Sequence, residues 1–249
     1  MIGSICLGLL VGVIASLTGL GGGVVMVPML PLLVGADQRQ AVATSLFVVF
    51  LNGLQISFFS IRKKKLDIRF ALPIAVIGIM TAYFSSLLIY RFSDFSLRLF
   101  LCFIMAFIIY ILIKPPHFTF HRGKNIFRYA VGAIAGFVSG LSGLGGGIVV
   151  GPLLLAGKAI SHQKLPSTIS FVSMCFSGVA TLTHLALNLP TRYSWGPILW
   201  KEGLLIFVPA VVVTKILFPL QQKLSETQRR NLLLVFSVVL FLKSLVSIL

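Results

Sequence analysis

Acidic residues are nearly absent from this chain of 249 residues, which has 5 Asp and Glu against 21 Lys and Arg. Four of the acidic residues lie in the polar stretches between apolar runs, and Glu202 alone begins an apolar run. A proton pump that relays protons through buried carboxylates is therefore not favoured. Charged residues of both signs make up 10% of the chain, whereas a soluble domain has about a quarter.

Cysteine is also scarce, with Cys6, Cys102 and Cys175 each inside an apolar run. An odd number without paired spacing predicts neither a disulfide framework nor a zinc site. The sequence also lacks a hydrolytic triad, a cluster of metal ligands and a Walker loop. We therefore expect no metal, no cofactor and no enzymatic activity.

Apolar runs, in contrast, dominate the chain, and 57% of its residues are hydrophobic. Several runs are long enough to span the roughly 30 Å hydrocarbon core, which predicts an all-α polytopic protein of the cell inner (plasma) membrane. The net charge of +16 does not indicate nucleic-acid binding, because the cations cluster in short loops, as in cytoplasmic loops of membrane proteins. The start, "MIGSICLGLL", lacks a basic n-region, so we expect it to be a retained first membrane segment.

Ten apolar segments are arranged in two sets of five. The first set covers 2–18, 24–35, 39–60, 68–90 and 95–113, and the second covers 126–142, 148–160, 164–188, 196–218 and 229–248. The polar link "KPPHFTFHRGKN", with its two prolines, separates the sets. We predict a first transmembrane repeat over 1–113, a connector over 114–125 and a second repeat over 126–249.

A glycine-rich motif occurs once in each half. "SLTGLGGGVVMVPML" (16–30) and "GLSGLGGGIVVGPLL" (140–154) have their Gly-Leu-Gly-Gly-Gly runs and a proline 124 positions apart, and 10 of 19 pairs between 12–30 and 136–154 are identical. Each glycine run precedes a segment of about 12 residues, which crosses only about half of the hydrocarbon layer. Each repeat is thus expected to hold a glycine-broken helix, a short re-entrant or half-crossing helix and three further helices.

The distribution of Lys and Arg predicts how the repeats are related. If the basic loop "IRKKKLDIR" is cytoplasmic and each broken pair returns to the side that it entered from, 15 of the 21 cations are cytoplasmic. If each broken pair makes one net crossing, the halves are parallel and about 12 are cytoplasmic. The positive-inside rule favours the first arrangement, which makes the halves inverted repeats, as is common in secondary transporters.

Glycine breaks at membrane depth have a chemical consequence. Irregular backbone is tolerated there only against protein or a watery cavity. The short helices are expected to begin at Val24 and Ile148, with free N–H groups and partial positive charge facing the breaks. Two such termini would suit a small anion. The alternative is that the glycines serve close helix packing, which explains single glycines better than three in a row.

Polar side chains lie near the breaks and deeper in the next helices. Thr18 and Ser142 are at equivalent positions, and the helix starts that follow contain Thr44, Ser45, Ser167, Thr168 and Ser170. These hydroxyls are candidate donors to an oxyanion, although such groups often bond a carbonyl of the preceding turn. Asn52 and Gln55 face similarly on one helix, and His184 is either a functional ionisable group or a helix cap near the interface.

These features resemble the sulfite exporter TauE/SafE family. The resemblance rests on the paired "TGLGGGVVMVPML" and "SGLGGGIVVGPLL", on "AVATSL" at 41–46 and on "VATLTHLALN…YSW" at 179–195, and it covers nearly the whole chain. It implies a bacterial or archaeal inner-membrane transporter of two repeats for small sulfur-containing anions such as sulfite, sulfoacetate or thiosulfate.

The resemblance also implies site residues by their place in the motifs. These are Gly19, Gly21, Gly22, Gly23, Pro28, Thr44 and Ser45 in the first half, and Gly143, Gly145, Gly146, Gly147 and Pro152 in the second. The second half has "PSTIS" where the family has a glycine–threonine–serine helix start. That departure bears on the hydroxyl contacts expected there and on the substrate.

We therefore predict a secondary transporter that moves a small anion, a sulfur oxyanion or organosulfonate, by alternating access. Export is favoured because an inside-negative potential drives each anionic charge outward by about 2.3 kcal/mol per 100 mV. The alternatives are proton- or sodium-coupled uptake and a non-transporting membrane scaffold. The expected partners are the anion and the lipid bilayer, without nucleic acid, and a homodimer is left open. The predicted substrate site comprises Thr18, Gly19, Gly21, Gly22, Gly23, Thr44, Ser45, Asn52, Ser142, Gly143, Gly145, Gly146, Gly147, Thr168, Ser170 and His184.

Overall fold

The computed structural model describes residues 2–19, 21–114, 125–156, 160–161, 163–187, 196–221 and 224–246. Within these ranges the regular structure is helical, without strands. The first set of helices is α1 (Ile2–Thr18), α2 (Gly23–Val34), α3 (Gln38–Arg62), α4 (Ile68–Leu88), the 3-10 helix η1 (Ile89–Arg91) and α5 (Asp94–Ile113). The second set is α6 (Asn125–Ser142), α7 (Gly147–Ala156), α8 (Leu165–Ala186), α9 (Trp200–Gln221) and α10 (Glu226–Val246). Most of the predicted connector lies outside the described residues.

The outer surface of the bundle is apolar. Among the described residues, four helical stretches are long and apolar enough to cross a bilayer: Gln38–Arg62, Ile68–Arg91, Asp94–Ile113 and Leu165–Ala186. On α4 the exposed side chains Leu72, Val76, Met80 and Phe84 form a stripe at four-residue spacing. Such a stripe belongs in lipid rather than in water. The helices and this surface fit the predicted polytopic membrane protein.

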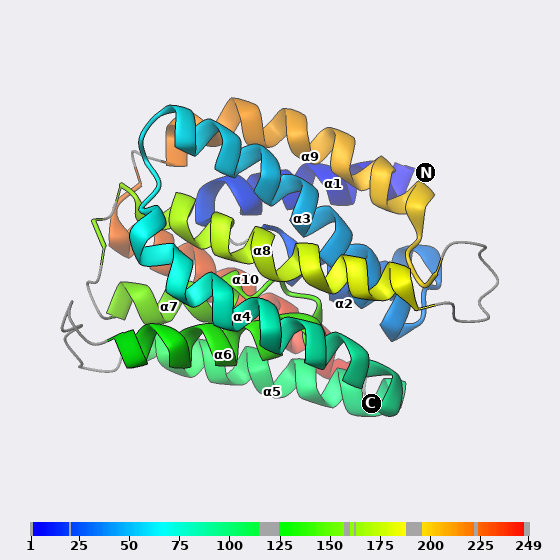
Figure 1. Ribbon diagram of the computed structural model, residues 1–249. Coiled ribbons are helices and arrows are strands. Elements are labelled where there is room, and N and C mark those ends of the chain that lie inside the picture. The colour runs from blue at the N-terminus through cyan, green and yellow to red at the C-terminus, as the bar shows by residue number, and fades with distance from the viewer. Residues whose placement is uncertain are drawn as a thin grey trace.

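Corresponding helices of the two sets run in opposite directions (Figure 1). Helix α3 leads from the right-hand end to the left and α8 returns, and the pairs α4/α9 and α5/α10 are likewise opposed. The α1–α2 pair opens toward the right-hand end, and the α6–α7 pair opens toward the left. Each short helix therefore returns toward the end from which its partner helix enters.

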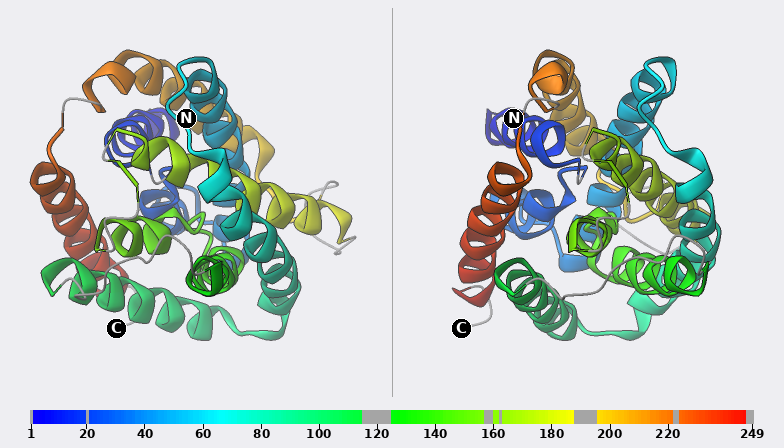
Figure 2. Two further views of the ribbon diagram at one scale, coloured as in Figure 1. Left: turned by 60° about the vertical axis from the view of Figure 1, so that its left-hand side comes forward. Right: turned by 90° about the vertical axis from the view of Figure 1, so that its left-hand side faces the viewer.

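The packing of the helices repeats between the halves. Helix α1 packs along α9 as α6 packs along α4, while α3 and α8 cross each other. The short helices lie inside the bundle (Figure 2): α2 contacts α1, α3 and α10, and α7 contacts α6, α8 and α5. The first residues of both short helices are consequently buried.

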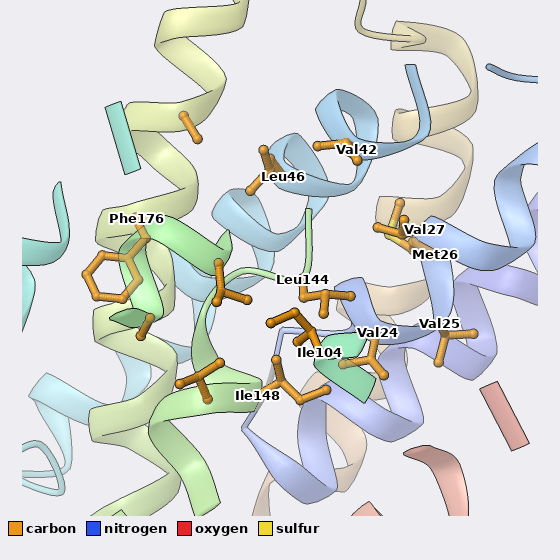
Figure 3. Packing of buried hydrophobic residues seen from close by; sticks show 14 of the residues in the cluster. Val24, Val25, Met26, Val27, Val42, Leu46, Ile104, Leu144, Ile148 and Phe176 are labelled. Carbon is orange, nitrogen blue, oxygen red and sulfur yellow. The ribbon is translucent and has the colours of Figure 1, made fainter. Parts of the chain in front are cut away.

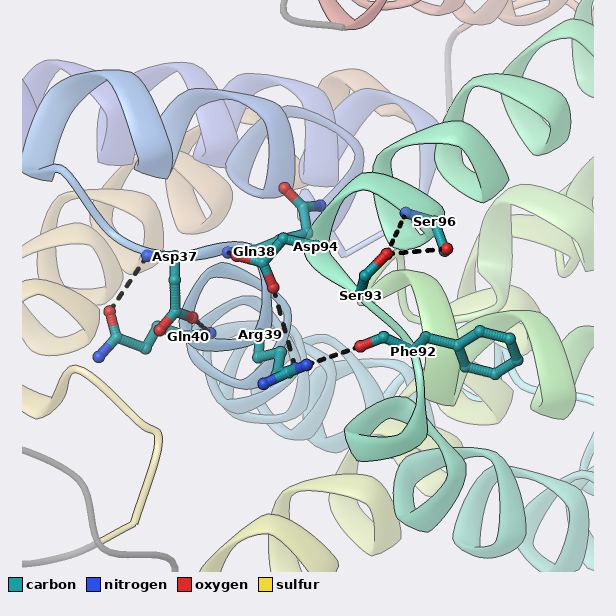
Figure 4. A network of polar contacts seen from close by, with 8 residues as sticks. All are labelled: Asp37, Gln38, Arg39, Gln40, Phe92, Ser93, Asp94 and Ser96. Carbon is teal, nitrogen blue, oxygen red and sulfur yellow. Dashed lines mark hydrogen bonds and ion pairs between the residues drawn. The ribbon is translucent and has the colours of Figure 1, made fainter.

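Side chains fix the junctions at the right-hand end (Figure 4). Asp37 caps α3 in a capping box, in which its carboxylate accepts from the N–H of Gln40 at 2.7 Å and its own N–H donates to that side chain at 3.2 Å. Arg39 donates to the carbonyl of Phe92 at 2.6 Å and lies 3.8 Å from Asp94. These contacts join the start of α3 to the start of α5 and so fix the position of the first turn of α3.

Candidate functional site

The two glycine runs share one backbone conformation. Gly19, Gly21 and Gly22 have φ of 77°, 75° and 83°, and their counterparts Gly143, Gly145 and Gly146 have 75°, 79° and 68°. These left-handed angles are easily reached only by glycine. The predicted breaks are therefore present in both halves and have the same shape.

Both short helices begin one residue earlier than predicted, at Gly23 and Gly147 instead of Val24 and Ile148. The reason is that the carbonyls of Gly22 and Gly146 already accept the first helical hydrogen bonds. They accept from the N–H groups three and four residues ahead, at 3.0 to 3.4 Å. The glycines thus act as N-caps, without any side chain over the helix end.

The two breaks meet at Val49 in the middle of α3. A Cβ on Gly21 would lie 2.7 Å from Val49 Cγ1, and a Cβ on Gly145 would lie 2.5 Å from the same atom. A Cβ on Gly23 would lie 2.7 Å from the carbonyl oxygen of Gly143. Leu144, at the centre of the second break, lies with apolar side chains from the starts of both short helices (Figure 3). The breaks converge on one buried point.

Two hydroxyls connect each half to the other half's break. Ser45 on α3 donates to the carbonyl of Gly143 at 2.8 Å, and Ser170 on α8 donates to the carbonyl of Gly19 at 3.0 Å. All four residues are buried. Each break is thus hydrogen-bonded to a helix of the other half in an equivalent way. The sequence alone did not indicate this arrangement.

The other predicted hydroxyls also have protein partners. Thr18 and Ser142 donate to carbonyls one turn back in their own helices, both at 2.6 Å. Thr44 accepts from the N–H of Leu199 at 3.0 Å, and Thr168 accepts from the N–H of Asp67 at 3.4 Å and donates to the carbonyl of Lys164 at 2.8 Å. An anion would compete with a carbonyl for the hydroxyl hydrogens of Thr18, Ser142 and Thr168, whereas Ser167 accepts from the hydroxyl of Ser60 at 2.8 Å.

Backbone N–H groups remain as donors at the breaks. Among the described residues, the N–H groups of Gly22, Gly146 and Ile148 have no acceptor. Buried N–H groups without acceptors are rare in proteins, because each carries a desolvation cost. Unpaired amides at the start of a helix are the donors that anions use.

Asn52 lies on the face of α3 that meets the breaks. Ser45, Val49 and Asn52 are spaced by four and three residues, so they share one side of the helix. Asn52 is fully buried, and neither its amide nitrogen nor its amide oxygen has a hydrogen-bond partner within the described structure. Of the predicted side chains near the breaks, Asn52 has the most unused hydrogen-bonding capacity.

His184 is remote from the breaks. It lies 14 residues beyond Ser170 on α8, which is about 21 Å along the helix. Its Nδ1 is 2.7 Å from the hydroxyl of Tyr90, and its buried Nε2 has no partner in the described structure. The structure therefore places His184 in a separate polar pair near the right-hand end of the bundle.

Charged side chains are not found at the breaks. Among the described residues, the buried polar and charged group contains no Lys, Arg, Asp or Glu, and no three potential metal ligands come together. Lys243 of α10 donates to the carbonyl of Pro28, more than one turn beyond the first break. Positive charge at the breaks thus comes from the backbone.

The fold and the twin breaks define a multi-pass helical membrane protein whose centre offers unpaired amides. Comparison with known proteins places it further: the chain belongs to the sulfite exporter TauE/SafE family, whose model matches residues 4–244. It is 29% identical over 240 residues to a probable membrane transporter protein of Methanocaldococcus jannaschii, covering 92% of this chain and 89% of that one.

Two bacterial relatives match over a smaller share of the chain. The probable membrane transporter protein YunE of Bacillus subtilis is 26% identical over 215 residues, covering 73% of this chain and 77% of its own. A probable membrane transporter protein of Haemophilus influenzae is 29% identical over 189 residues, with 70% and 68% covered. No solved structure matches. The family and these relatives are membrane transporters, not enzymes.

Proposed function

We propose that the chain is a secondary transporter of the inner membrane that carries a small anion, a sulfur oxyanion or organosulfonate, and favours export. The observation that carries the proposal is the meeting of two glycine breaks at Val49, where the N–H groups of Gly22, Gly146 and Ile148 have no acceptor among the described residues. The membership in a sulfite exporter family supports the sulfur-containing class of substrate. The substrate is proposed to bind where Val49 now lies between the breaks.

We infer that the two sets of helices are inverted repeats, with the left-hand end of Figure 1 cytoplasmic. The opposed directions of paired helices and the exchanged packing, α1 on α9 and α6 on α4, support this relation. The basic loop between α3 and α4 and the start of α8, which follows Lys164, lie at the left-hand end. The positive-inside rule assigns such an end to the cytoplasm.

The buried breaks correspond to a closed state of an alternating-access cycle. The hydrogen bonds from Ser45 to Gly143 and from Ser170 to Gly19 cross between the halves. Movement of one half against the other would break one of these bonds and open the central point toward one side. Because the two bonds are equivalent, similar interactions would close the central point toward each side of the membrane.

An uncoupled anion carrier should follow the membrane potential. In proteoliposomes with 100 mV imposed, a monovalent substrate such as hydrogen sulfite is expected to accumulate on the positive side by up to about fiftyfold, the equivalent of about 2.3 kcal/mol. Reversing the potential should reverse the flux. Protein-free liposomes are the control, and an anion flux that ignores the sign of the potential would contradict the proposal.

Coupled uptake remains the second candidate, and the unpartnered Nε2 of buried His184 favours it. A proton-coupled importer is expected to take up the anion against an inside-negative potential when a proton gradient is imposed. His184→Ala should then reduce this uptake at least tenfold, since the proton would lose its carrier. Anion uptake by the variant is the measurement. If the variant takes up the anion as fast as the wild type, His184 does not couple transport to protons.

The alternative function, a non-transporting membrane scaffold, cannot be tested by alanine substitutions at the breaks. A Cβ on Gly22 or Gly146 would lie 2.5 Å from a buried carbon of Val11 or Phe176. Both substitutions would therefore disturb folding whether the protein transports or only assembles with partners. Asn52 is a better probe, because replacing an unpaired buried amide removes no hydrogen bond of the described structure.

A further inference from the structure

We infer that the transported species is a monoanion that also carries a hydrogen-bond donor, and that Asn52 is the side chain that selects it. The inference rests on the proposed function and narrows the class of substrate for the same site. It combines two independent features of the breaks: the charge that the backbone offers, and the unpaired amide of Asn52.

The charge at the breaks matches one negative charge. A helix N-terminus is equivalent to roughly half a positive charge, and α2 and α7, of 12 and 10 residues, both begin at the central point. The buried residues of the described structure include no charged side chain that would add to this, and Lys243 reaches only Pro28. A dianion would keep about one charge uncompensated among buried residues, which is strongly disfavoured.

The side chains at the breaks point to a substrate with a donor. Ser45 and Ser170 already donate their hydrogens to backbone carbonyls. Asn52 offers two N–H donors and one carbonyl acceptor, all unused. Its donors suit oxyanion oxygens, whereas its carbonyl oxygen would repel an anion that presents oxygens alone. A hydroxyl, an acidic S–OH or an amine on the substrate would satisfy that oxygen.

The second half does not duplicate this group. Asn52 precedes Gly53 on α3, and Ser177 precedes Gly178 in the matching part of α8. The two glycines lie at the crossing of these helices, where each approaches a side chain of the other helix. The hydroxyl of Ser177 is used locally, since it donates to the carbonyl of Ser173 at 2.6 Å. Of these two matched positions, only the one on α3 carries a side-chain amide.

Three sulfonates of similar size test the inference with the full-length protein in proteoliposomes. They are 2-hydroxyethanesulfonate, a monoanion with a donor; ethanesulfonate, a monoanion without one; and ethane-1,2-disulfonate, a dianion. Initial rates at equal concentration should fall in that order, with at least a tenfold loss from the first to the last. The reversal potential should correspond to one negative charge per substrate. Hydrogen sulfite is included as a fourth substrate.

The variant Asn52→Leu is expected to transport the two monoanions at similar rates while still rejecting the dianion. Its matched control is Ser57→Ala, which also removes a buried polar group, here a hydroxyl, that has no partner in the described structure. Ser57 lies five residues further along α3, about 140° around the helix from Asn52. The control should keep the order of the wild type. Thermal unfolding in detergent checks folding, and Asn52→Ser replaces the leucine variant if that variant does not fold.

Each outcome supports or overturns a defined part of the inference. A dianion carried as well as the monoanions would overturn the charge argument while leaving anion transport intact. A preference for the hydroxyl that survives in both Asn52 variants would overturn the role of Asn52. If the wild type carries none of the four anions, the proposed function itself fails, and the inference fails with it.

Discussion

Gly145→Ala is expected to lower the stability of the protein by about 3 kcal/mol and to abolish transport. Alanine in a left-handed conformation costs about 1–2 kcal/mol, and Gly145 has a φ of 79°. Its new Cβ would lie 2.5 Å from Val49 Cγ1. Val49 is also packed against Gly21, so it cannot move aside without disturbing the other break, and such overpacking costs a further 1–3 kcal/mol or so. Unfolding in detergent measures the loss.

Gly35→Ala is the matched control for this prediction. Gly35 has a φ of 67°, but a Cβ added to it would meet nothing within 4 Å, so its alanine variant carries only the backbone cost. The double variant Gly145→Ala with Val49→Ala should recover part of the loss, because the clashing atom is gone. A double-mutant cycle gives this coupling energy. Equal losses for Gly35→Ala and Gly145→Ala would show that Val49 does not restrict the break.

The breaks were predictable because their signal is local. Glycine runs followed by proline interrupt a helix whatever surrounds them, and a repeat at 124 positions leaves little doubt that the feature occurs twice. Helix ends were less accurate: the segment predicted at 39–60 is a helix over Gln38–Arg62. Helix ends depend on capping contacts, which apolar runs do not reveal.

The contacts between the halves were not predictable. Val49 is one of several valines in an apolar stretch, and nothing in its neighbours marks it as the residue that meets both breaks. Ser45 was a candidate anion donor, but its acceptor in the structure is a carbonyl 98 residues away. Such pairings arise from the crossing of α3 with the other half, which no local pattern encodes.

Close helix packing through small residues occurs in the structure at the breaks and also at glycines along α1 and α6. Four-residue spacing of small residues marks close packing of membrane helices, and it is the alternative explanation of the breaks in the sequence. In the structure the break glycines also approach other helices closely, since a Cβ on Gly19 would lie 2.8 Å from the carbonyl oxygen of Pro166 in α8. Gly132, Gly136 and Gly140 lie against α4, and Gly8 and Gly12 lie against α9.

Gly136→Ala is expected to cost about 3 kcal/mol of stability, although alanine normally favours a helix. In an open helical position the change from glycine would stabilise by up to about 1 kcal/mol. Here the new Cβ would overlap the carbonyl oxygen of Gly78, and it would lie 2.7 Å from that residue's Cα. Backbone atoms cannot rotate away as a side chain can, so α4 and α6 must separate. Unfolding in detergent again provides the measurement, and transport should fall with the folded fraction.

The matching position in the other half provides an internal comparison. Gly12, 124 residues earlier, faces α9, where a Cβ would lie 2.8 Å from the carbonyl oxygen of Ala210. Gly12→Ala should therefore destabilise in the same direction but by less, since this contact is looser. Gly3→Ala, on the same helix and 3.4 Å from a flexible leucine tip, should leave stability unchanged or slightly higher. If Gly136→Ala behaved like Gly3→Ala, the backbone contact between α4 and α6 could not be what holds these helices together.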